Sequence, residues 1–158
     1  MMIEFSAETM ERFKKTLAKY EPETEAALLP TLWIAQEEFG YLSVEVMAYV
    51  ASLLNLPPSK VYSVASFYTM YKKEPTGKYH IQVCRTLSCK LRGAEEVSKM
   101  ICDRLGVKLG DTTPDNKYTV VEVECLGSCG TAPMMQINND YHENLTRSKV
   151  NQIIDSLV

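Results

Sequence analysis

The cysteines of this 158-residue chain are the residues whose type and spacing most directly indicate chemistry. Four of the five occur in two close pairs, Cys84 with Cys89 and Cys125 with Cys129. Cysteine thiolates are soft ligands, and sets of four bind zinc or iron–sulfur clusters. A disulfide framework is disfavoured, because the number of cysteines is odd and the acidic N-terminal segment lacks the features of a secretory signal. The two pairs therefore predict a metal centre.

Each cysteine pair begins where a predicted strand ends. Residues 79–83 alternate apolar and polar side chains as a strand does, and residues 118–124 are predicted as a second strand. Cys84 and Cys125 follow these strands directly. Between the strands, residues 92–105 show the apolar period of a helix. A strand, helix, strand order predicts parallel strands joined by a right-handed crossover, with both carboxyl ends at one edge of the sheet. Open α/β sheets bind ligands at this edge, so we expect the four thiolates to converge there.

Four converging thiolates match the ligand set of a 2Fe-2S cluster, in which each iron takes two of them. Such a cluster carries a net negative charge and needs hydrogen-bond donors or dipoles nearby. Cys89 is expected just before the helix that starts at Arg92, whose amino end presents free N–H groups. Gly127 and Gly130 are expected to give the second loop the backbone freedom that brings amide hydrogens near sulfur. Further candidate donors or charges in the first loop are Arg85, Thr86 and Ser88.

Structural zinc is the main alternative for the four cysteines. Its usual knuckles are C-x2-C pairs, whereas this chain has C-x4-C and C-x3-C, so zinc is less favoured. A dithiol redox site is also disfavoured, because no C-x-x-C occurs. Cys102 falls well along the predicted helix and is expected as a buried or partly buried free thiol. His80 and His142 alternate with apolar residues on predicted strands, where we expect structural roles.

The N-terminal part of the chain, residues 1–75, is expected to form a helical bundle. Capping residues, breakers and apolar spacing predict its helices at about 6–20, 22–39, 43–55 and 59–67. A group of aromatic residues at and after the last helix fits either the core or an interaction surface, and its helical spacing favours the core. The group comprises Tyr62, Phe67, Tyr68 and Tyr71.

A turn-forming segment around Pro75 and Gly77 separates the bundle from a second predicted domain, residues 76–158. This domain begins with the strands and helix that carry the cysteines. It ends with a predicted hairpin, at about 134–143, and a helix capped by Thr146.

Composition places the chain among ordinary globular proteins, with 46% hydrophobic and 23% charged residues. A formal charge of −3 with scattered Lys and Arg argues against a nucleic-acid-binding surface. The longest apolar runs span only a few residues, far short of the ~20 needed to cross a bilayer. We therefore expect a protein without a membrane span, although it can still be a peripheral part of a membrane assembly.

Three stretches of the sequence resemble the E-type subunit of NADH:quinone oxidoreductase, the respiratory complex I. The first stretch is residues 61–70, VYSVASFYTM. The second joins HIQVC at residues 80–84 to CKLRGA at residues 89–94. The third is ECLGSCGTAP at residues 124–133, which continues into QIN at 136–138. The cysteine spacing matches the pattern of this family at all four positions.

The resemblance implies a thioredoxin-like 2Fe-2S ferredoxin domain, residues 76–158, behind an N-terminal helical bundle that docks a partner. It also implies that one 2Fe-2S cluster is bound by the four paired cysteines, Cys84, Cys89, Cys125 and Cys129. The implied partner is the F-type flavoprotein subunit, which binds NADH and FMN and has an iron–sulfur cluster of its own. The cluster of this chain would exchange an electron with that FMN.

The implied protein is a subunit of an NADH dehydrogenase without a substrate site of its own, because no Gly-rich dinucleotide fingerprint follows a strand. Its expected location is cytoplasmic, peripheral on the inner face of the membrane through the complex. Two alternatives stay open. One is the equivalent subunit of an NAD-linked hydrogenase or formate dehydrogenase, and the other is a four-cysteine zinc-stabilised interaction module without redox activity.

Overall fold

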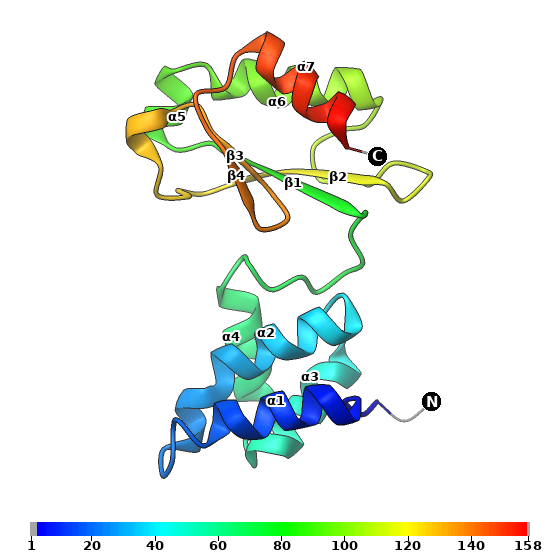
Figure 1. The fold of residues 1–158 in the computed structure, drawn as a ribbon, viewed down its shortest axis with the longest axis vertical. Coiled ribbons are helices and arrows are strands. Elements are labelled where there is room, and N and C mark those ends of the chain that lie inside the picture. The colour runs from blue at the N-terminus through cyan, green and yellow to red at the C-terminus, as the bar shows by residue number, and fades with distance from the viewer. Residues whose placement is uncertain (1–2, 158) are drawn as a thin grey trace. The chain divides into compact units, whose positions relative to one another are not determined.

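The computed structural model describes residues 3–157. The chain divides into two compact units, Met1–Pro75 and Thr76–Val158, and each unit has its own hydrophobic core (Figure 1). The division falls in the turn-forming segment that contains Pro75 and Gly77. None of the described helices is both long and apolar enough to span a bilayer.

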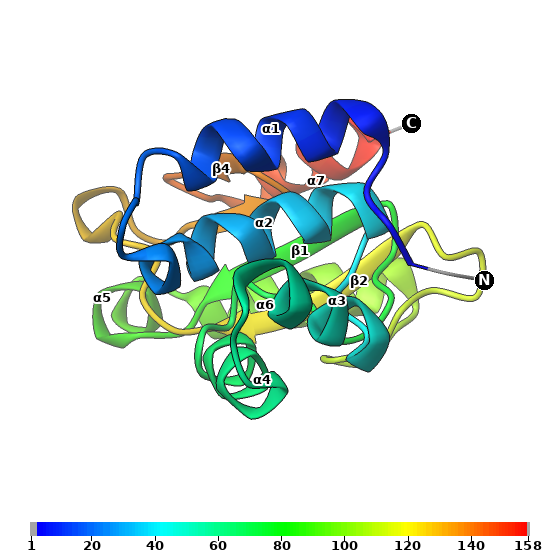
Figure 2. The ribbon, with the colours of Figure 1, turned by 90° about the horizontal axis from the view of Figure 1, so that it is seen from below.

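The first unit is a bundle of helices in which α2 packs between α1 and α3, and α4 packs on α3 and α2 (Figure 2). Two serines cap helices as expected: the Ser6 hydroxyl accepts the amide hydrogen of Thr9, and the Ser43 hydroxyl accepts that of Val46. The elements are α1 (Ala7–Leu17), η1 (Thr24–Ala27), α2 (Leu28–Phe39), α3 (Val44–Leu54) and α4 (Pro58–Phe67).

The first two predicted helices, 6–20 and 22–39, are both too long. α1 ends at Leu17. Beyond it, the Tyr20 amide donates to the carbonyl of Leu17, three residues back, and this is the spacing of a 3-10 turn and not of an α-helix. Pro22 lies outside any helix, and the short 3-10 helix η1 leads into α2, which begins at Leu28. Local tightening of this kind is common at helix ends, where α-type hydrogen bonds lack partners.

A buried polar side chain and a buried phenol fasten the segment that follows α4 to the bundle. Gln36 donates to the Met70 carbonyl at 3.1 Å and accepts the Lys72 amide hydrogen at 2.5 Å. The Tyr71 side chain is only 3% exposed, and its hydroxyl donates to the Leu29 carbonyl at 2.8 Å. Buried polar groups are stable when hydrogen-bonded in this way.

The expectation that all four aromatic residues near α4 join the core is wrong for three of them. Tyr71 is buried, but Tyr62 is 53%, Phe67 78% and Tyr68 40% exposed. The buried residues of α4 are Val61 and Ala65, which lie one turn apart and use its contact face. The other three aromatic side chains are therefore exposed on the first unit, and the rings of Phe67 and Tyr68 contact each other with centroids 5.0 Å apart.

The second unit is a four-stranded sheet with helices on one face, and its strand order is β2-β1-β3-β4. β1 and β2 are parallel, as predicted, while β3 pairs antiparallel with β1 and β4 with β3. The elements are β1 (Tyr79–Cys84), α5 (Leu87–Leu91), α6 (Ala94–Leu105), β2 (Tyr118–Val123), η2 (Cys129–Thr131), β3 (Met135–Ile137), β4 (Asp140–His142) and α7 (Arg147–Ser156).

The core of this unit lies between the sheet and the pair α6 and α7 (Figure 1). Ile81 of β1 pairs with Val120 of β2 and Ile137 of β3, and all three are buried. Alternate residues of a strand point to one face, so this row faces the helices. Val150 and Ile154 of α7 complete the core.

The helix predicted at 92–105 is α6, and a short helix that was not predicted, α5, comes just ahead of it. Gly93 separates them with a φ of 89°, a left-handed conformation that glycine adopts without a steric penalty. The first of the two helices contains Cys89. The fold therefore places Cys89 inside a short helix of its own and not just before a longer one.

We expect Tyr71→Phe to lower the free energy of unfolding of the first unit by about 1 kcal/mol at neutral pH, because the bond to the Leu29 carbonyl is lost. Burial, followed by the charge of Tyr68, raises the pKa of Tyr71 to about 12. The folded state thus favours the protonated phenol. Its contribution is complete below the ordinary tyrosine pKa of about 10 and is lost as the pH rises through 12.

The stability difference between wild type and Tyr71→Phe should therefore shrink between pH 10 and pH 12. Trp33 is the single tryptophan of the chain and lies in α2, so its fluorescence during denaturant titrations reports the first unit. A difference that stays constant over this pH range would contradict the prediction.

Candidate metal centre

The parallel pair of β1 and β2 delivers both cysteine loops to the same edge of the sheet. Cys84, the last residue of β1, lies opposite Val123, the last residue of β2. The pairing continues one step further, since the Arg85 amide donates to the Val123 carbonyl at 3.0 Å. The Arg85 guanidinium also donates to the Glu124 carboxylate, with Nε at 3.0 Å, and joins the two loops at the surface. The two cysteine loops therefore leave the sheet side by side, as the sequence predicts.

The first cysteine pair is held inside the unit. Cys84 and Cys89 are each 2% exposed, and both belong to its hydrophobic core. Cys84 is fixed by β1, and Cys89 by the buried side of α5. The Thr86 hydroxyl lies 3.3 Å from Cys84 Sγ, so one of the donors predicted in the first loop does reach sulfur.

The surroundings of these two thiols shift their pKa values in opposite directions. Burial acts to raise the pKa of Cys84, but hydrogen bonds from the Thr86 hydroxyl and the Leu126 amide outweigh it and lower that pKa. Burial, followed by the hydrogen bond with Cys84, raises the pKa of Cys89 to about 11. Backbone amides thus help to stabilise negative charge on sulfur, which is what a cluster ligand requires.

The amide donors differ in part from those that the sequence predicts. Cys89 does not lie at the amino end of the helix after Arg92, because it belongs to α5, and its backbone donor is Met134. In the second loop, Gly127 has a φ of 81° and its amide donates to Cys125 Sγ at 3.4 Å, as predicted. Gly130 adopts no left-handed conformation, so the role predicted for it is wrong.

The second cysteine pair is exposed to solvent. Cys125 and Cys129 are both exposed, and their sulfur atoms lie 3.9 Å apart. Two thiolates bound to one tetrahedral metal ion at about 2.3 Å are separated by about 3.8 Å. The spacing of this pair therefore suits two ligands of a single metal ion.

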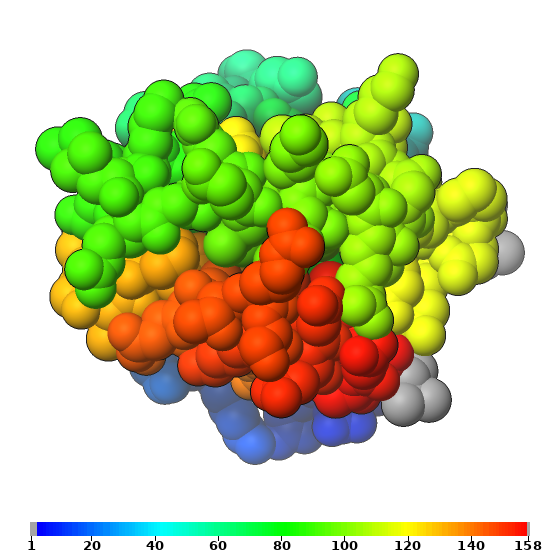
Figure 3. Space-filling view, turned by 90° about the horizontal axis from the view of Figure 1, so that it is seen from above, coloured from blue at the N-terminus to red at the C-terminus, as the bar shows by residue number. Residues whose placement is uncertain are grey.

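The two loops meet at one end of the sheet. The Leu126 amide of the second loop reaches Cys84 at the end of β1. In Figure 3, the gold surface of the second cysteine loop adjoins the green surface around α5. Within residues 3–157, no group of three or more His, Cys, Asp or Glu side chains is placed to hold one metal ion. The cysteines are arranged as two pairs, one buried and one exposed.

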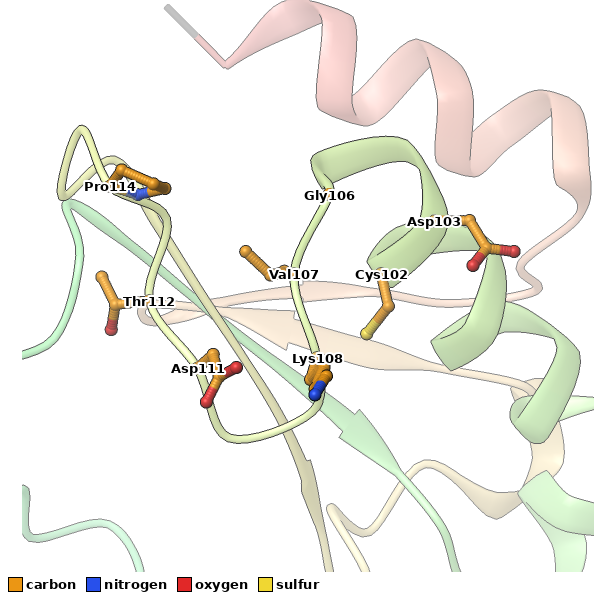
Figure 4. A pocket seen from close by; sticks show the side chains of 8 residues that line it. All are labelled: Cys102, Asp103, Gly106, Val107, Lys108, Asp111, Thr112 and Pro114. Atoms are coloured by element: carbon orange, nitrogen blue, oxygen red, sulfur yellow. The ribbon is translucent and has the colours of Figure 1, made fainter.

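Cys102 does not belong to this arrangement. It lies on α6 and is partly buried, as expected, and burial followed by the charge of Asp103 raises its pKa. Figure 4 shows its side chain lining a pocket formed by the end of α6 and the loop towards Pro114. The two histidines are strand residues, with His80 on β1 and His142 on β4.

A polar network beside Cys129 is not predicted by the sequence. The Ser128 hydroxyl donates to the Glu143 carboxylate, and the Thr131 hydroxyl donates to the same oxygen at 2.6 Å. Ser128 and Thr131 flank Cys129 closely in the chain, but Glu143 comes twelve residues after Thr131. No local spacing signal connects such distant residues, so only the folded chain reveals the network.

Comparison with known proteins identifies a family and its members. The family model for thioredoxin-like 2Fe-2S ferredoxins matches residues 13–158. The E-type subunit of the NADH-quinone oxidoreductase of Rickettsia conorii is 45% identical over 155 residues, which cover 97% of this chain and 93% of that protein. NADH-quinone oxidoreductase subunit 2 of Thermus thermophilus is 46% identical over 146 residues, covering 91% of this chain and 81% of that protein.

Two further comparisons extend the likeness. The mitochondrial NADH dehydrogenase (ubiquinone) flavoprotein 2 of Dictyostelium discoideum is 43% identical over 156 residues, covering 98% of this chain and 63% of that protein. A chain in the crystal structure of an air-oxidized NAD+-reducing NiFe hydrogenase has a TM-score of 0.72 at 23% identity, over 82% of this chain and 22% of that one. This structural likeness concerns the fold alone. With the family match, it confirms the predicted α/β ferredoxin fold behind N-terminal helices.

We expect Gly127→Ala to destabilise the second unit by about 1 kcal/mol, because alanine is strained in a left-handed conformation. Gly130→Ala is the matched control, since Gly130 has no positive φ and nothing lies within 4 Å of an added Cβ. Denaturant unfolding of the metal-free chain, followed by far-ultraviolet circular dichroism, measures both changes. Equal destabilisation by the two variants would show that the conformation of Gly127 is not the cause.

Proposed function

Because the chain belongs to the thioredoxin-like 2Fe-2S ferredoxin family, we propose that it is the electron-transfer subunit of an NADH:quinone oxidoreductase. In this proposal the ligands of its cluster are the four paired cysteines, Cys84, Cys89, Cys125 and Cys129. One observation supports this assignment. The parallel strands β1 and β2 end at the same edge of the sheet, and one cysteine pair begins at or just after the end of each strand.

The donor set fits the cluster. A 2Fe-2S cluster needs two thiolates for each iron, and once bound it takes up and releases one electron. The chain offers two pairs of sulfurs, and the spacing of 3.9 Å within the exposed pair suits ligands of one metal ion. The Gly127 amide and the Thr86 hydroxyl both contact cysteine sulfur and can stabilise the negative charge there. Contacts of this kind are a recognised influence on the reduction potential of such clusters.

Metal content and cysteine replacement test the ligand assignment. The full chain, purified without oxygen, should contain about two irons and two acid-labile sulfides and give a rhombic paramagnetic signal on reduction. Cys125→Ser should weaken or reshape that signal, because it replaces one proposed ligand. Cys102→Ser is the control and should leave the signal intact, since Cys102 lies on α6, away from both pairs.

Two results would contradict the assignment. A colourless protein with about one zinc would favour the zinc-stabilised module. Loss of the signal in Cys102→Ser would show that the four ligands were wrongly chosen.

The partner in this proposal is the F-type flavoprotein subunit, which carries NADH and FMN and exchanges an electron with the cluster. The names of the relatives support the parent complex. In this proposal the chain is peripheral to the inner face of the membrane through that complex. We propose that the first unit, residues 1–75, docks this partner. The support is the exposed aromatic surface of Tyr62, Phe67 and Tyr68, because aromatic residues are enriched in protein interfaces.

Co-expression with candidate flavoprotein subunits tests the docking role. Phe67→Ala should weaken capture of the NADH:quinone oxidoreductase flavoprotein by about tenfold, because a large apolar side chain is lost from the interface. Val44→Ala is the control, since Val44 is also an exposed apolar residue of the first unit, at 69% against 78% for Phe67. Equal capture by Phe67→Ala and wild type would contradict the docking surface. Exclusive capture of a hydrogenase flavoprotein would replace the parent complex in the proposal.

A further inference from the structure

The turn that carries Cys129 is not held by hydrophobic packing. η2 consists of three residues, and none of them is buried. Cys89, by contrast, is 2% exposed and is held in α5 by the core of the unit. A short exposed turn has few contacts to oppose local opening. The position of Cys129 must therefore depend on polar contacts.

Most polar contacts of the second cysteine loop hold its two ends. At the beginning, the Tyr141 hydroxyl donates to the Leu126 carbonyl at 2.7 Å. At the end, the Leu145 amide donates to the Pro133 carbonyl at 3.0 Å, and the Asn144 amide donates to the Thr131 carbonyl at 2.7 Å. None of these contacts involves the segment from Gly127 to Gly130, which includes Cys129.

The carboxylate of Glu143 bridges this segment. One of its oxygens accepts hydrogen bonds from the hydroxyls of Ser128 and Thr131, which lie on either side of Cys129 and Gly130. The two hydroxyl oxygens are also 2.7 Å apart, so the three side chains form one compact group. Hydrogen bonds to a carboxylate are roughly twice as strong as those between neutral groups. Glu143 is partly buried, and so are its two donors.

We propose that Glu143 is a positioning residue for the metal ligand Cys129, a role that rests on the proposed function. By holding Ser128 and Thr131 together, its carboxylate fixes the turn in which the Cys129 sulfur lies 3.9 Å from that of Cys125. Glu143 touches neither sulfur in this role. Its effect is to keep the exposed pair in ligand geometry, and so to slow the loss of iron from the solvent-exposed side of the site.

The experiment measures the rate at which an iron chelator removes iron from the full chain loaded with its cluster. Glu143→Ala removes the acceptor, and we expect iron loss to be about tenfold faster, with a changed visible circular dichroism spectrum of the cluster. Thr131→Val removes one donor to Glu143, together with a 3.2 Å contact from that hydroxyl to the Ser128 carbonyl, with little change of shape, and should also accelerate iron loss. The double variant should be no faster than Glu143→Ala alone, because both changes break one network.

Glu143→Gln is the conservative variant, because its amide oxygen still accepts both hydroxyl hydrogens. It should keep most of the wild-type rate and spectrum, because the neutral amide accepts the same two hydrogens in weaker bonds. The matched control is Asp115→Ala, which removes a similar carboxylate in the same unit. Asp115 accepts from the Thr113 hydroxyl at 2.5 Å and the Lys117 amide at 3.0 Å, before the start of β2 and therefore at the opposite end of that strand. This variant should keep the rate of the wild type.

Several outcomes would overturn the inference. They are wild-type rates in Glu143→Ala, iron loss in Glu143→Gln as fast as in Glu143→Ala, and equally fast loss in Asp115→Ala. Should Glu143→Ala not fold, a wild-type rate in Thr131→Val would overturn the inference by itself. Failure of the proposed function gives a different result, because the wild-type chain would then take up no iron and sulfide at all. In that case the role proposed for Glu143 would also be wrong.

Discussion

The parallel pairing of β1 with β2 is the constraint on which the rest of the second unit depends. It aligns Cys84 with Val123, so that two loops far apart in the sequence leave the sheet at one edge. A shift of this register by one residue would turn Cys84 to the opposite face and separate the sulfurs. The buried row of Ile81, Val120 and Ile137 opposes such a shift, because these side chains must face α6 and α7. The hydrophobic core thus sets the position of the site.

The two halves of the site are stabilised by different forces. Cys84 and Cys89 are part of the hydrophobic core, and burial in close-packed surroundings restricts their side chains. Cys125 and Cys129 lie at the surface, where the loop is shaped by a left-handed glycine and by hydrogen bonds with the side chains of Glu143 and Tyr141. A redox site benefits from both conditions. In the proposed cluster, one pair of ligands is buried, while the other pair would place its metal ion close to the molecular surface, where a partner can approach.

The two units carry separate physical tasks. The second unit contains all five cysteines and the sheet edge that brings two pairs together. The first contains none, but it exposes three large aromatic side chains, Tyr62, Phe67 and Tyr68, of which the last two are in ring contact. Its interior is fully formed without them, since Gln36 and Tyr71 tie the segment after α4 to the bundle. The three exposed side chains are therefore free to contact a partner without any loss of buried core in this unit.

The sequence by itself determined the types of most elements and the parallel pair of strands, and it indicated the four cysteines that we propose as ligands. These features follow from local periodicity, chain order and spacing, which act over a few residues or through a general rule of handedness. Tertiary structure decided the break between α5 and α6, the amide donors Leu126 and Met134, the outward position of Phe67 and the bridge from Glu143. Each of these depends on which distant backbone or side chain packs alongside, and the spacing of residues along the chain contains no record of that.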